Sequence, residues 1–144
     1  MIKNLLFSFL SLIILSGCAT PIINGPMFSK ALNPPKADIG TLYVFRAKGG
    51  LGEEAYMPVK VNGVPFVNLA PMGYSYQYLT PGIYQLSIGN TAYGSIMTEV
   101  EIKPGQELYE LFDAFGNSVN DVSPSKAPFL FKEFRYIQAY QLGK

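Results

Sequence analysis

Apolar residues recur at every second position along much of the chain, the pattern of β-strands that turn one face to a core. In residues 95–102 this alternation places the isoleucines and Val100 inward and the two glutamates in water. Residues 39–46 are apolar or β-branched at nearly every position, which predicts a strand buried on both faces. Further strands are predicted at residues 57–61, 64–70, 74–79, 83–89 and 107–113.

Three tight turns divide residues 57–89 into four short strands. Asn62-Gly63 is the dipeptide that type I′ hairpin turns favour, because both central residues of that turn need a positive φ. Pro71-Met72-Gly73 and Thr80-Pro81-Gly82 supply the next two breaks, since proline removes a ladder donor and glycine relaxes the backbone beside it. The simplest arrangement that fits is a meander, in which each strand pairs with the next.

The C-terminal third is open to more than one interpretation. Residues 107–113 suit a strand, with a short helix as the alternative because the leucines also match helical spacing. Residues 114–127 are polar and broken, which predicts a long loop. Residues 128–142 favour a final strand, with Phe129, Leu130 and Phe131 packing just before it, although helical spacing fits as well. The expected fold is an all-β antiparallel sandwich or partly open barrel of about seven or eight short strands, with at most one short helix within residues 108–131.

Composition places the chain among ordinary single-domain proteins and removes several kinds of function. Its 144 residues and 49% apolar content are enough for one hydrophobic core without structural staples. Lysine and arginine number 11 against 10 acidic residues, so there is no basic surface of the kind that binds nucleic acid. The sequence has no histidine, which removes the commonest general base and metal ligand. We therefore expect no enzymatic activity, no metal and no cofactor.

Three patterns that could carry chemistry have simpler explanations. Ser123 and Lys126 form an S-x-x-K pair, but Pro124 and the polar surroundings argue against the helix that would bring them together. Glu99 and Glu101 share one strand face, where contact with water is expected rather than acid and base catalysis. Turn formation accounts equally well for four residues that could bind a cation weakly. These are Asp113, Asn117, Asn120 and Asp121.

The first residues have the layout of a bacterial signal peptide. A short basic stretch containing Lys3 precedes an apolar run over residues 5–15, which is too short for a stable transmembrane helix. Leu15-Ser16-Gly17-Cys18 then resembles the lipobox of bacterial lipoproteins. The resemblance implies cleavage between Gly17 and Cys18, a thioether-linked lipid on the sulfur and acylation of the new α-amine. The alternatives are an uncleaved membrane anchor and an ordinary cysteine, which would have no disulfide partner within the chain.

The lipobox sets the expected organisation and location. Residues 1–17 would be the signal peptide, residues 18–36 a lipidated tether rich in Pro, Asn and Gly, and residues 37–144 the β domain. Apolar tether residues such as Phe28 leave open whether part of the tether packs on the domain. Ala19 stands where many Gram-negative lipoproteins of the inner membrane have aspartate. In a Gram-negative source we expect the periplasmic face of the outer membrane.

Four features of the first two thirds of the chain occur together. They are the lipobox, the strand at residues 41–46, the hairpin at residues 59–63 and the Pro-Gly-Ile-Tyr step at residues 81–84. In these features the chain resembles bacterial lipoproteins with the DUF2846 domain, a family without a settled activity. The last step is also similar to PEGA and transthyretin-like β-sandwich domains. The resemblance implies a β-sandwich in the cell envelope and supplies no catalytic residues.

The expected function is that of a membrane-anchored envelope lipoprotein that binds a protein partner or supports an envelope assembly. The 10 tyrosines motivate this expectation, because tyrosine combines a broad contact surface with a polar tip. Tyr74, Tyr76 and Tyr78 are the candidates for an exposed face, although most tyrosines are expected to pack the sandwich. The alternative is a carbohydrate- or small-ligand-binding module, with aromatic rings stacking on sugar rings near residues 47–56.

Overall fold

The computed structural model describes residues 23, 25–49, 55–90, 94–113 and 117–140. The predicted signal peptide and Cys18 lie outside the described residues. Within the described part, nine strands, one 3-10 turn and one short α-helix follow one another. The helical elements are η1 (Lys30–Leu32) and α1 (Ala127–Leu130). The strands are β1 (Gly40–Arg46), β2 (Met57–Val61), β3 (Val64–Leu69), β4 (Gly73–Leu79), β5 (Gly82–Asn90), β6 (Gly94–Ile102), β7 (Glu107–Asp113), β8 (Ser118–Asp121) and β9 (Arg135–Tyr136).

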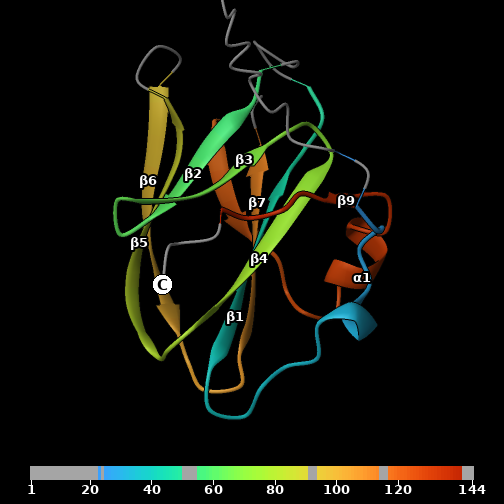
Figure 1. Ribbon diagram of the computed structural model, residues 1–144, viewed down its shortest axis with the longest axis vertical. Helices are drawn as coiled ribbons and strands as arrows, with labels where there is room; N and C mark the ends of the chain where they lie inside the picture. The colour runs from blue at the N-terminus through green and yellow to red at the C-terminus, as the bar shows by residue number, and fades with distance from the viewer. Residues whose placement is uncertain (1–22, 24, 50–54, 91–93, 114–116, 141–144) are drawn as a thin grey trace, which may run out of the picture.

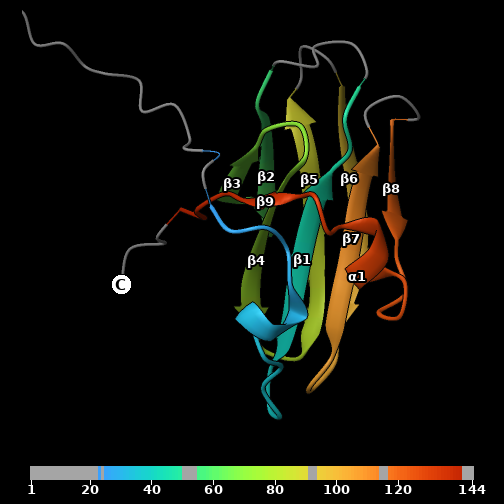
Figure 2. The same ribbon diagram turned by 90° about the vertical axis from the view of Figure 1, so that its right-hand side faces the viewer.

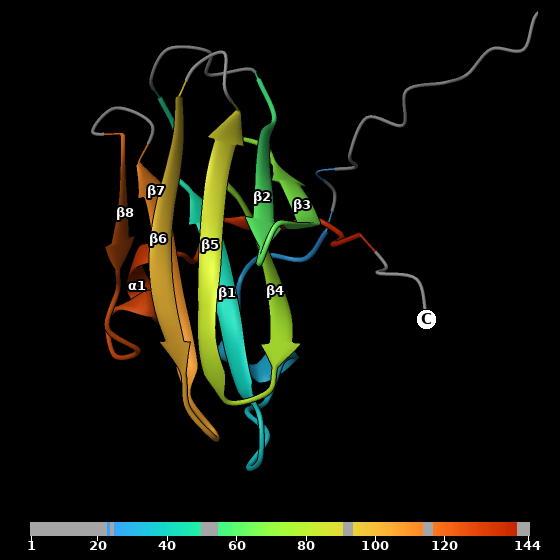
Figure 3. The same cartoon turned by 90° about the vertical axis from the view of Figure 1, so that its left-hand side faces the viewer.

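The strands form two sheets packed face to face, which confirms the predicted all-β sandwich (Figure 1). Sheet A has the order β8-β7-β1-β4-β9, and sheet B has the order β3-β2-β5-β6. Most neighbours are antiparallel, but β1 pairs with β7, and β4 with β9, in parallel. Figure 3 views the molecule from the side of sheet B. Figure 2 views the opposite side, where η1, α1 and the N-terminal segment lie in front of sheet A.

β1 is buried on both faces, as its nearly unbroken apolar sequence predicts. Leu42 and Val44 point between the sheets, where they join side chains of sheet B such as Leu86. Tyr43 and Phe45 belong to a second, aromatic cluster on the other face of sheet A. Because both faces of its central strand are apolar, sheet A needs a cover on each side, and the domain has a third layer.

The Asn62-Gly63 turn between β2 and β3 forms as predicted, with positive φ values of 50° and 77°. The predicted meander is wrong beyond this hairpin. β4 crosses to sheet A and pairs with β1, whereas β5 pairs with β2 in sheet B. The reason is that alternation determines which side chains share a face of a strand, but it does not determine which strand lies beside it.

For the C-terminal third, some predictions are confirmed and others are wrong. Residues 107–113 form a strand and not a helix. The loop predicted for residues 114–127 contains β8, which pairs antiparallel with β7. The final strand predicted over residues 128–142 is instead α1, a turn and the two-residue β9. Pro128 lies in the first turn of α1, where its missing N–H breaks no helical hydrogen bond. The segment crosses over sheet A as a cover, so only two of its residues pair with it.

Gly63→Val is expected to lower the free energy of unfolding by about 1–3 kcal/mol, because a β-branched residue is strained at positive φ. The strain is conformational, since no heavy atom beyond the two neighbouring residues lies within 4 Å of the position that a Cβ would take. Gly63→Asn is the matched control and should cost less, because asparagine tolerates the left-handed region. Urea unfolding of both variants measures the difference. Equal stability of Gly63→Val and the wild type would contradict a type I′ turn.

Candidate functional site

A layer of irregular segments covers the outer face of sheet A, the face turned away from sheet B. It consists of residues 25–33, α1 and residues 131–137, which we call the outer layer (Figure 2). A 2.9 Å hydrogen bond from the Phe28 N–H to the Phe134 carbonyl joins its N-terminal and C-terminal parts. The sequence predicts a tether over residues 18–36. The structure shows that its second half belongs to the folded domain.

Phe28 is the centre of the aromatic cluster beneath the outer layer. Its side chain is only 6% exposed, and its ring lies edge-to-face with five others at centroid distances of 5.2 to 6.1 Å. Pairs of this kind contribute about 0.5–1.5 kcal/mol beyond the burial of their surface. The N-terminal segment is therefore held by packing as well as by backbone hydrogen bonds. The five rings are those of Tyr43, Phe45, Tyr74, Tyr109 and Phe131.

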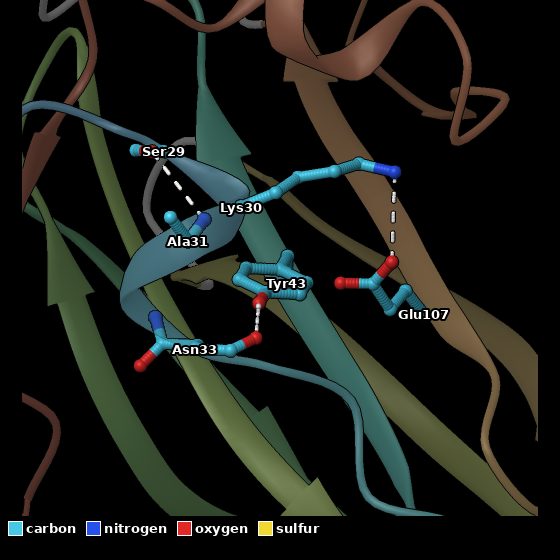
Figure 4. A network of polar contacts seen from close by, with 6 residues as sticks. All are labelled: Ser29, Lys30, Ala31, Asn33, Tyr43 and Glu107. Carbon is cyan, nitrogen blue, oxygen red and sulfur yellow. Dashed lines mark hydrogen bonds and ion pairs between the residues drawn. The ribbon is translucent and has the colours of Figure 1, made fainter.

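A polar network under η1 also ties the outer layer to sheet A (Figure 4). Lys30 Nζ lies 3.5 Å from Glu107 Oε2 and 5.6 Å from the centre of the Tyr109 ring. The Tyr43 hydroxyl donates to the Asn33 carbonyl at 3.3 Å. Among the described residues, Glu107 Oε1 and the Tyr109 hydroxyl have no well-aligned hydrogen-bond partner. Burial, and then the negative charge of Glu107, raises the pKa of both tyrosines, so both hydroxyls stay protonated.

Two charged side chains lie between the sheets. Arg46 is fully buried, and its guanidinium donates to the carbonyls of Ala55 and, at 2.9 Å, Leu69. These bonds join the end of β1 to the residues before β2 and to the end of β3. Glu110 is 6% exposed, and burial, followed by the charge of Asp121 on β8, raises its pKa to about 7. The sequence does not reveal either side chain, because both occupy inward positions where alternation predicts apolar residues.

The three tyrosines predicted to form an exposed face do share one face of β4, but this face is the one under the outer layer. Tyr74 is 1% exposed and packs on Phe28, and burial raises its pKa to about 12. The prediction that Tyr74 belongs to an exposed surface is therefore wrong. Tyr76 and Tyr78 are half-buried, and burial raises the pKa of Tyr76. Lys36 Nζ lies 4.1 Å from the centre of the Tyr78 ring.

The other candidate residues are dispersed. Ser123 Oγ lies 3.3 Å from Ser125 Oγ, and Ser123 and Lys126 are exposed on a turn. Glu99 and Glu101 are exposed on the outer face of sheet B, as predicted. In the described part of the chain, no cluster of three or more acidic, cysteine or histidine side chains is placed to hold a metal ion. None of the helices in that part is long and apolar enough to cross a bilayer.

α1 turns apolar side chains away from the domain. Only Ala127 of its four residues is buried, whereas Phe129 is 80% exposed and Leu130 is 51% exposed. The sequence predicts that Phe129, Leu130 and Phe131 pack together before a final strand. Phe131 does pack in the core, but the prediction is wrong for the other two, because the chain makes a helical turn here that directs Ala127 and Phe131 inward. A shallow hollow of about 430 Å³ lies beside them. Its lining residues are Ser125, Lys126, Phe129 and Leu130.

Comparisons with known proteins add little to this description. No protein-family model matches the chain, and no curated protein matches it. Among solved structures, it is similar to the N-terminal domain of AlgF from P. aeruginosa, with a TM-score of 0.43 and 23% sequence identity. The match covers 60% of this chain and 96% of that one. A similarity at this level carries no argument about function, and the resemblance to DUF2846 lipoproteins stays a prediction.

Phe28→Ala is expected to lower the free energy of unfolding by about 3–5 kcal/mol, because it leaves a cavity among five rings. Met27→Ala is the matched control: the neighbouring side chain is 51% exposed, so its loss should change stability by about 0.5 kcal/mol or less. Thermal and urea unfolding measure both variants. Similar stability for both variants would mean that the N-terminal segment is a tether that does not pack on the domain.

Glu110→Gln is expected to remove a pH dependence of stability. Because the pKa of Glu110 is about 7 in the folded state and about 4.3 in an unfolded chain, the folded state binds more protons between these values. The contribution of Glu110 to the free energy of unfolding should therefore be fully present below about pH 4.3. It should be lost as the pH rises through 7, a fall of roughly 3 kcal/mol. Urea unfolding at pH 5 and pH 8 measures the fall. The exposed Glu99→Gln is the control, and a fall that persists in Glu110→Gln would contradict the assignment.

Proposed function

We propose that this chain is an envelope lipoprotein whose domain binds a protein partner, or supports an envelope assembly, without catalysing a reaction. Cys18 carries the lipid, and the domain is held at a membrane surface. In a Gram-negative cell, Ala19 favours the outer membrane, with the domain in the periplasm. Several acyl chains, at about 0.8 kcal/mol for each buried methylene, make such an anchor firm.

The observation that carries the proposal is the place of Phe28 in the domain. Because the segment after the lipobox is packed into the outer layer, little free chain is left between the lipid and the domain. Seven residue steps separate Cys18 from Gly25, the first residue of the outer layer. Seven residues span at most about 25 Å when fully extended. A lipid on Cys18 would hold the domain close to the bilayer, as suits a protein that acts at a surface.

The candidate residues favour a binding role over a catalytic one. The hydroxyls of Tyr43 and Tyr109 are protonated and buried under η1, out of reach of a substrate. Ser123 and Lys126 lie on an exposed turn, which does not desolvate the lysine as a catalytic base requires. The carbohydrate-binding alternative concerns residues 47–56, of which residues 50–54 lie outside the described residues.

Cys18→Ala is expected to abolish incorporation of radiolabelled palmitate and to release the protein from the membrane fraction, because the acylated thiol is lost. Ala19→Ser is the matched control, since it keeps the thiol and should be labelled and fractionate normally. Palmitate labelling and fractionation of cell extracts measure both variants. Normal membrane partitioning of Cys18→Ala would contradict the lipid anchor.

Photo-cross-linking in intact cells that make the lipidated protein tests the binding role. One photoreactive residue replaces the half-buried Tyr78 on the outer face of sheet A, and another replaces the exposed Gln85 on the outer face of sheet B. A discrete protein adduct at one of these positions is expected. Background adducts alone at both positions would contradict a protein-binding role while leaving the anchor in place.

A further inference from the structure

The apolar tip of α1 has no partner within the described part of the domain. Phe129 exposes 80% of its surface and Leu130 51%, and neither belongs to the inner or the aromatic cluster. Scattered exposed apolar residues are ordinary, but here two adjacent ones border a hollow of about 430 Å³. Adjacent exposed apolar side chains beside a hollow are typical of a surface that contacts another molecule.

The tip of α1 lies in the outer layer. The N-terminal segment of the same layer leads back along the chain to the predicted lipid site at Cys18. α1 leads directly into Phe134 and Arg135, which pair with Phe28 and Met27 of the N-terminal segment. Figure 2 shows α1 and this segment on the same side of sheet A. The seven residue steps from Gly25, the first residue of the outer layer, back to Cys18 span at most about 25 Å. A short link that starts from this layer keeps the layer, rather than sheet B, near the membrane.

The charges around the tip match a lipid surface. Residues 126–135 contain three exposed cations and one exposed carboxylate, that of Glu133. The outer face of sheet B is mixed instead: Glu99 and Glu101 are exposed on β6, Lys103 Nζ lies 3.6 Å from Glu101 Oε2, and Lys60 is exposed on β2. Lys126 lines the hollow with Phe129 and Leu130, and the other two cations follow within five residues of the helix. Exposed apolar side chains accompanied by lysine and arginine suit the headgroup region of a bilayer that contains anionic lipids. The three cations are Lys126, Lys132 and Arg135.

We propose that α1 docks on the bilayer that holds the lipid anchor, with Phe129 and Leu130 inserted among the headgroups. The inference rests on the proposed lipidation of Cys18, and it adds an orientation to it. The outer layer faces the lipid, and the outer face of sheet B points away from the membrane. The occupant of the α1 surface is thus a phospholipid bilayer and not a protein partner.

The chain contains no tryptophan, so a single introduced tryptophan reports the surroundings of one position. Phe129→Trp is the test variant, and Met97→Trp, 59% exposed on the outer face of sheet B, is the matched control. Both are prepared as full-length lipidated proteins in phosphatidylethanolamine and phosphatidylglycerol vesicles that carry brominated acyl chains, which quench nearby tryptophan. Phe129→Trp is expected to be quenched severalfold more than Met97→Trp and to emit at shorter wavelength.

Vesicle flotation of the same samples separates the two proposals. If both variants float with the vesicles but their tryptophans are quenched equally, the anchor is retained and the docking of α1 is overturned. Proteins that do not float would overturn both. Reversing two of the flanking charges, as Lys126→Glu and Lys132→Glu in the Phe129→Trp chain, should reduce its quenching by half or more, whereas Glu99→Lys should not. A photoreactive residue at position 129 that forms a discrete protein adduct in cells, and none with lipid, would also overturn the docking.

Discussion

The structure depends on one constraint: the central strand of sheet A is apolar on both faces. A sheet with one wet face can stand as half of a two-layer sandwich, but β1 buries every residue from Gly40 to Arg46. Sheet B covers the inner side. Water would otherwise meet the rings of Tyr43 and Phe45 on the outer side, so the domain must supply a second cover.

That cover comes from the two ends of the described chain. Phe28 from the N-terminal segment meets Phe131 and Phe134 from the C-terminal one, and the rings interlock edge-to-face over β1, β4 and β7. Both segments are mostly irregular: they contain the short elements η1, α1 and β9. The Lys30 and Glu107 ion pair, at 3.5 Å, adds electrostatic attraction at the edge of this cover, although partly exposed pairs contribute little alone.

The same constraint links the fold to the proposed role. Since Phe28, which follows the predicted lipid attachment site by ten residues, also closes the core, a lipid on Cys18 would be joined to the domain by a short stretch of chain. The domain then has two unlike faces. One is the outer layer, with apolar α1 and its cations, and the other is sheet B, with exposed glutamates on β6. A protein held so close to a bilayer would present these faces in a defined orientation.

The sequence by itself determined the class of fold, most strand positions and the first hairpin, because these follow from local alternation and turn chemistry. Asn62 and Gly63 have the positive φ values that their residue types favour, and the faces of β5 and β6 are as alternation predicts. Only the tertiary structure decided that β4 joins β1, that Tyr74 is buried and that Phe129 is not. Those outcomes depend on which segment lies over a given face, and a segment distant in the chain supplies that contact. Local patterns carry no information about it.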